Sequence, residues 1–141
     1  MADNRNDSDA PREAREAREP RGELSIRTIA MPADTNPSGD IFGGWLLAQM
    51  DLAGGTAAWR RARGRVATIA VDGMTFHLPV HVGDVLCCYA ELVKTGRTSM
   101  TYLIEAWVLR GPESSLREMV TEGHFTFVAI DEDGKPRPLP E

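Results

Sequence analysis

The chain has only two cysteines, and no stretch of it approaches the roughly 18–20 consecutive apolar residues that span a membrane. The cysteines, Cys87 and Cys88, are neighbours in an apolar, strand-like segment, and no further cysteine is present to complete a metal site with them. The N-terminus lacks the apolar core of a secretion signal. We therefore expect a cytoplasmic protein whose two cysteines are small buried side chains, with no bound metal.

Positive charge is also scarce. The chain has 16 Lys and Arg residues and 21 Asp and Glu residues, which gives a net charge of −5 at pH 7. Domains that bind nucleic acids are usually basic, so no nucleic-acid partner is expected. A local basic patch for a phosphorylated ligand remains compatible with this charge. The length of 141 residues and the hydrophobic content of 42% suit one domain with a core of its own.

Residues 1–22 differ in character from the rest of the chain. Eleven of these 22 residues are charged, and acids alternate with bases in the Arg-Glu-Ala repeat over 12–19. The segment has no apolar stripe with which to pack against a core. We predict a disordered tail over 1–22 and a single folded domain over 23–141.

Within the folded part, apolar and polar residues alternate in a way that predicts five strands. Short turns separate the last four strands, including a tight hairpin turn at 95–97, so neighbouring strands should be antiparallel. The predicted strands cover residues 24–30, 66–77, 85–93, 98–110 and 119–130.

One long apolar helix is predicted over 42–62, between the first and second strands. Ser38 or Asp40 is expected to cap its start, and basic residues followed by Gly64 are expected to end it. Since apolar residues lie on most sides of this helix, it must be covered on more than one side. The expected fold is α+β, with a curved antiparallel sheet of about five strands wrapped around the central helix. Its open sheet edge and apolar flank predict a dimer.

The segment 31–55 carries the strongest functional signal. A single carboxylate, Asp51, lies in the middle of the apolar helix, where an acid has to be paired, protonated or used in chemistry. Asn36 lies on the turn that leads into the helix. Gly43 and Gly44 stand where the helix begins, so their backbone N–H groups are available to a developing negative oxygen. This combination points to acyl transfer or hydrolysis.

Each of these residues also has an ordinary structural explanation. Asp51 suits a carboxylate that pairs across a dimer, and as a catalytic group it suits either a general base or a nucleophile. Asn36 precedes a proline, as turn asparagines often do. Gly43 and Gly44, like Gly54 and Gly55 further along, each weaken a helix by up to about 1 kcal/mol, which suggests close approach of backbone, subunit or ligand.

Four stretches of the folded part, residues 31–46, 71–76, 79–85 and 133–137, resemble the hotdog-fold acyl-CoA thioesterases, and the YciA-type, cytosolic acyl-CoA hydrolase branch in particular. The first stretch is long and unusual in composition, whereas the Pro-Val-His-Val-Gly-Asp turn at 79–84 is less specific. Together the stretches span roughly residues 23–140, so the resemblance implies a single hotdog domain over the whole folded part.

This resemblance implies an enzyme that hydrolyses acyl-CoA to a free acid and CoA without a metal or cofactor. It also implies an active site between two protomers, with Asn36 from one and Asp51 from the other. The expected assembly is a homo-oligomer with a dimer as its minimal unit, arranged as a trimer of dimers.

The diphosphate and 3′-phosphate of CoA should meet basic residues near turns. Each basic residue taken singly is as well explained as a solvated surface charge. The hairpin at 94–99 and the helix end at 63–65 are the favoured positions. The full set of candidates is Arg63, Arg65, Lys94, Arg97, Thr98, Ser99, Lys135 and Arg137.

Two rival functions stay open on the same fold. An enoyl-CoA hydratase or dehydratase would use a histidine before the central helix, where this chain has Asn36. A non-catalytic acyl-CoA sensor should lack the carboxylate at Asp51 or carry a basic DNA-binding extension. The acyl chain length that the protein prefers is not predicted.

Overall fold

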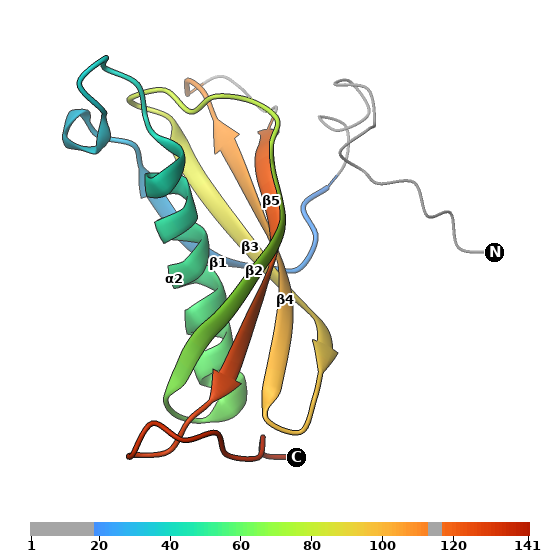
Figure 1. Cartoon of the computed structure of the whole chain (residues 1–141). Coiled ribbons are helices and arrows are strands. Elements are labelled where there is room, and N and C mark those ends of the chain that lie inside the picture. The colour runs from blue at the N-terminus through green and yellow to red at the C-terminus, as the bar shows by residue number, and fades with distance from the viewer. Residues whose placement is uncertain (1–18, 113–116) are drawn as a thin grey trace.

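The computed structural model describes residues 19–112 and 117–141, in which a five-stranded antiparallel sheet curves around one long helix (Figure 1). This confirms the predicted α+β fold. Residues 1–18, most of the predicted tail, lie outside the described residues. No helix among the described residues is long and apolar enough to cross a membrane. The elements are β1 (Glu23–Ile29), the short 3-10 helix η2 (Pro32–Asp34), α2 (Gly43–Ala62), β2 (Val66–Phe76), β3 (Val85–Thr95), β4 (Ser99–Leu109) and β5 (Arg117–Ala129).

The strands are ordered β1-β3-β4-β5-β2, so β1 and β2 form the two edges of the sheet. The core lies between the sheet and one face of α2, where Met50 and Ala53 of the helix meet Ile104 and Phe127 of the strands. Strand alternation predicts one apolar face for β4, but both faces of its second half are buried. Glu105 and Trp107 lie on the face opposite the helix side and are almost fully buried there.

Two residues at the end of the predicted tail, Glu19 and Arg21, contact the sheet. The backbone N–H of Arg21 donates to Glu105 Oε1 at 2.9 Å, and its guanidinium lies 3.0 Å from Glu91 Oε2. Glu19 forms an ion pair with Arg117 at 2.7 Å. These contacts hold the chain in place just before β1 begins at Glu23.

The start of α2 differs from the prediction. The prediction that Ser38 or Asp40 is the N-cap is wrong, because Phe42 occupies that position and makes no side-chain cap hydrogen bond. Asn36 explains the difference, since its Oδ1 accepts the backbone N–H groups of Ser38 at 2.9 Å and of Asp40 at 3.1 Å. Those residues therefore belong to a loop closed by Asn36 and not to the helix cap.

The other end of α2 follows the prediction with one change. The helix ends at Ala62, but the residue in the left-handed conformation is Arg63, with φ of 55°, and not Gly64. The N–H of Gly64 donates to the carbonyl of Trp59 at 3.2 Å, which satisfies a carbonyl of the last turn.

Both cysteines are buried and unbonded to each other, as expected from their apolar surroundings. Burial, together with a smaller effect of the neighbouring Cys87, raises the pKa of the Cys88 thiol to about 12. Cys88 is therefore a neutral, unreactive thiol at physiological pH.

A buried ion pair fixes the turn that precedes β3. Asp84, which is 5% exposed, accepts the backbone N–H of His81 at 2.8 Å and lies 3.1 Å from Nε of Arg110. The same guanidinium lies 2.8 Å from Glu118 and donates to the carbonyl of Pro79. One arginine thus joins the turn, the end of β4 and the start of β5.

Much of the apolar surface of α2 and β2 is not covered by the chain itself. Leu52 and Trp59 on the helix are 56% and 57% exposed, and Ile69 on the edge strand β2 is 58% exposed. The apolar helix is therefore covered by its own sheet on one side only. The rest carries exposed apolar side chains of the kind that line protein interfaces.

Candidate active site

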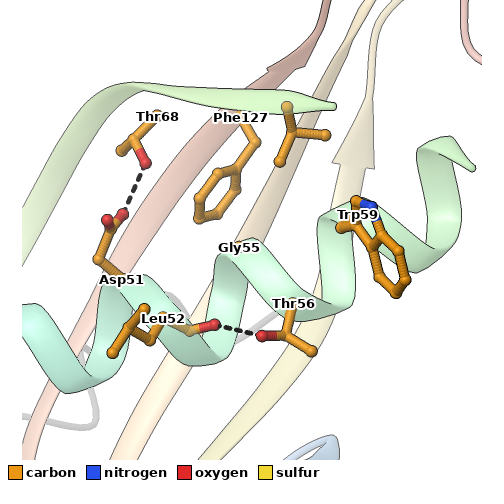
Figure 2. Close-up of a pocket in the computed structure, with 8 residues that line it drawn as sticks. Asp51, Leu52, Gly55, Thr56, Trp59, Thr68 and Phe127 are labelled. Atoms are coloured by element: carbon orange, nitrogen blue, oxygen red, sulfur yellow. Dashed lines mark hydrogen bonds between the residues drawn. The ribbon is translucent and has the colours of Figure 1, made fainter. Parts of the chain in front are cut away.

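Asp51 lies in the middle of α2 and points toward the edge strand β2 (Figure 2). Its Oδ1 accepts a hydrogen bond of 2.6 Å from the hydroxyl of Thr68. This short, charge-assisted bond fixes the orientation of the carboxylate and leaves Oδ2 available for another partner. The sequence analysis did not identify Thr68, because a threonine within a strand has the residue type that strands favour anyway.

A cavity of about 460 Å³ opens beside this carboxylate. It extends along α2 from Asp51 toward Trp59, and Phe127 of β5 projects into it (Figure 2). Its walls are mainly apolar, which is typical of a site that binds an uncharged part of a ligand. The residues that line it are Asp51, Leu52, Gly55, Thr56, Trp59, Val66, Thr68 and Phe127.

The other predicted catalytic groups lie elsewhere in the chain. Asn36 is in the loop before α2 and is not among the residues that line the cavity. Gly43 and Gly44 form the first two positions of α2, where backbone N–H groups have no acceptor within a helix. Eight residues of helix separate Gly43 from Asp51, a rise of about 12 Å. A single chain therefore does not bring these donors to the carboxylate.

The predicted phosphate-binding residues gather at the far end of the molecule from Asn36, around the end of α2, the β3–β4 hairpin and the C-terminal segment (Figure 1). The N–H of Leu139 donates to the carbonyl of Arg97 at 2.9 Å, which links the C-terminal segment to the hairpin. The candidates that are exposed at this end are Arg63, Arg65, Lys94, Arg97 and Lys135.

Two of the candidates already have structural partners. Arg137 donates to the carbonyls of Ala62 at 2.9 Å and Ile130 at 3.1 Å, and so closes the C-terminal end of α2. Arg65 donates to the carbonyls of Asp131 and Glu132 at 3.3 and 3.2 Å. Thr98 and Ser99 are half-buried at the start of β4. These four residues therefore have a structural role at this end of the molecule, independent of any ligand.

Among residues 19–112 and 117–141, no group of three or more His, Cys, Asp or Glu side chains is arranged to hold a metal ion. The chemistry that the described site offers is that of an oriented carboxylate beside an apolar cavity, with hydroxyl groups and a distant basic cluster.

Comparison with known proteins points in the same direction. Residues 38–114 match the family model described as the thioesterase superfamily. The chain is 57% identical over 123 residues to the acyl-CoA thioester hydrolase YciA of Salmonella typhimurium, covering 86% of this chain and 92% of that protein.

Two solved structures share the fold and much of the sequence. The hexameric broad-specificity acyl-coenzyme A thioesterase HI0827 aligns with a TM-score of 0.83 and 47% identity, over 88% of this chain and 85% of that one. The hexameric thioesterase y2039 from Yersinia pestis aligns with a TM-score of 0.81 and 58% identity, over 87% of this chain and 99% of that one.

Proposed function

This chain belongs to the thioesterase superfamily and is an acyl-CoA hydrolase, and from that premise we propose that Asp51 carries its reaction, the hydrolysis of acyl-CoA to a free acid and CoA without a metal. The observation that supports this role is the hydrogen bond between Thr68 and Asp51 at the edge of an apolar cavity. A carboxylate oriented in this way is ready to act on a neutral thioester bound beside it.

In the proposed reaction, Asp51 acts as a general base. Its free oxygen takes a proton from a water molecule, and the resulting hydroxide adds to the thioester carbonyl carbon. The carbonyl oxygen becomes an oxyanion, the tetrahedral intermediate collapses, and the carbon–sulfur bond breaks. CoA leaves as a thiolate, which needs less acid assistance than an amine would. Direct attack by the carboxylate on the same carbon is the alternative step.

The oxyanion needs donors that one chain does not place near Asp51. We propose that a partner protomer supplies them, with the backbone N–H groups of Gly43 and Gly44 facing the oxyanion and Asn36 orienting the reactants. The uncovered apolar flank of α2 and the exposed edge strand β2 support an interface on this side.

A dimer is then the minimal active unit, and the hexameric state named for HI0827 and for the Yersinia pestis thioesterase favours a trimer of dimers here. We expect light scattering at working concentration to give a mass of about six chains. An active monomer would contradict the shared site.

At the basic end, the exposed side chains of Arg63, Lys94, Arg97 and Lys135 are proposed to meet the phosphates of CoA. Their place beyond the C-terminal end of α2, away from Asp51, suits a ligand that is charged at one end and reactive at the other (Figure 1). Arg65 and Arg137, which are bonded to backbone carbonyls, contribute positive potential to the same region.

The direct test is the release of free thiol from a panel of acyl-CoAs with short, medium and long chains. We expect the purified protein to release CoA from at least one class, and the profile to identify the preferred acyl length. No release from any member would contradict the proposed activity and would direct attention to the hydratase and sensor functions.

The Thr68–Asp51 hydrogen bond gives a separate prediction. Replacing Thr68 with valine removes the donor at almost constant volume, so kcat should fall by about tenfold with little change in KM. Thr68→Ser keeps the hydroxyl and should restore most of the rate. Steady-state kinetics of both variants on the best acyl-CoA would check this, and a valine variant with the kcat of the wild type would contradict the role of Thr68.

A further inference from the structure

Two adjacent glycines of α2 have different surroundings. Gly54 is buried against the sheet, where an added Cβ would lie 2.8 Å from Cζ of Phe127 and 3.1 Å from Cδ1 of Ile104. Real Cβ atoms do not approach other heavy atoms as closely as the first of these distances. The packing of the helix on the sheet therefore explains Gly54 completely.

Gly55 has no such explanation. A Cβ added there would lie 3.7 Å from Cε1 of Phe127, an ordinary contact distance, and no closer neighbour is found. The residue is in the middle of a helix, where alanine is more favourable than glycine by about 1 kcal/mol. The fold alone would be more stable with alanine at this position, so the reason for the glycine lies outside the fold.

The cavity supplies a reason. Gly55 lines the cavity between Asp51 and Trp59, so a side chain at this position would occupy space that is now open (Figure 2). The space lies between the reactive carboxylate and the basic end of the molecule. Arg63 follows Asp51 by twelve residues, which corresponds to about 18 Å along a helix.

One part of acyl-CoA has about the length of the helix between Asp51 and Arg63. The pantetheine arm, which joins the diphosphate of CoA to its sulfur, is a narrow amide chain about as long as four extended peptide residues, roughly 15 Å. It has to cross the distance between the phosphates and the thioester. A mainly apolar channel with the hydroxyls of Thr56 and Thr68 on its walls suits such a chain.

We propose that the pantetheine arm of CoA passes over Gly55 between the basic end and Asp51. A side chain at this position would occupy the space that the arm needs. This inference rests on the proposed function. It assigns Gly55 to recognition of the part that all acyl-CoAs share, and not to selection among acyl groups.

The test compares Gly55→Ala with the matched variant Gly54→Ala, one residue away. We expect Gly54→Ala to lower the melting temperature, and Gly55→Ala to leave it equal or raise it. Gly55→Ala should raise KM by roughly tenfold for short, medium and long acyl-CoAs alike, and should raise the inhibition constant of free CoA by a similar factor.

Three results would overturn the inference. A rise in KM for long chains only, with unchanged inhibition by CoA, would place the acyl group beside Gly55. Unchanged KM and inhibition would remove any ligand from this position, and a less stable Gly55→Ala variant would show that the fold or a subunit contact needs the glycine.

Calorimetric binding of free CoA to the wild type and to Gly55→Ala separates this inference from the proposed function. It needs no turnover, so a wild type that hydrolyses no acyl-CoA would contradict the proposed activity, while the difference in CoA binding still decides the role of Gly55. Equal CoA affinity of the two proteins would contradict that role.

Discussion

The Asp51→Asn variant should lose thioester hydrolysis while remaining folded and assembled. Asparagine has the same shape as aspartate and can still accept the hydrogen bond that Thr68 donates, but its amide cannot take a proton from water. Loss of a general base typically lowers the rate by about 10²–10⁴-fold, so kcat should fall within this range. Thiol release under saturating acyl-CoA is the measurement.

Three control measurements make this result specific. The melting temperature, the mass of the oligomer and the affinity for free CoA should match those of the wild type, because Asp51 is proposed to activate the attacking water and not to bind the CoA moiety. The milder Thr68→Val variant should lie between the wild type and Asp51→Asn. An asparagine variant that hydrolyses acyl-CoA at the wild-type rate would remove Asp51 from the chemistry.

The Asp84→Ala variant should lower the free energy of unfolding by about 1–3 kcal/mol. The reason is that it removes one of the two carboxylates that contact the guanidinium of Arg110 and leaves the backbone N–H of His81 without its acceptor. Denaturation by urea, with both proteins at the same concentration, would measure the change, since oligomer stability depends on concentration.

Asp84→Asn is the matched control, because it can keep the acceptor for His81 while losing the charge that Arg110 contacts. It should retain part of the stability that the alanine variant loses. Since Asp84 lies outside the cavity that contains Asp51, folded Asp84→Asn enzyme should keep its kcat. An alanine variant as stable as the wild type would show that the ion pair contributes nothing net to stability.

Much of this fold could be predicted because its local signals agree with one another. Alternating apolar residues, short turns and one continuous apolar segment are sufficient to place the strands and the helix within a few residues of their observed limits. Asp51 could be selected as a candidate for a similar reason, since a lone acid within an apolar helix conflicts with its surroundings.

Other features depend on contacts that are remote in sequence. Nothing local marks Thr68 as the partner of Asp51, or Arg110 as the partner of Asp84 across 26 residues. The pair Gly54 and Gly55 is symmetrical in sequence, yet a Cβ would clash with Phe127 at Gly54 and would have room at Gly55, which lines the cavity.

The basic residues show the same limit. Arg63 and Arg137 are both arginines near predicted turns, but Arg137 closes the end of α2 whereas Arg63 is exposed. The sequence also could not show that Asn36 closes its own loop and so takes Ser38 and Asp40 away from the helix cap. In each case the deciding partner is set by packing, which single-residue patterns do not encode.

The order of strands in the sheet has a consequence for how the enzyme matures on the ribosome. β2, which carries Thr68, is bonded to β5 alone, and Thr68 is paired there with Phe127. Residues 63–116, a little under half of the folded domain, are therefore translated between α2 and the strand that holds β2 in place. A nascent chain that has not yet released β5 contains Asp51 but no fixed partner for it. The hydrogen bond between Thr68 and Asp51 is therefore fixed only after the last strand of the domain becomes available.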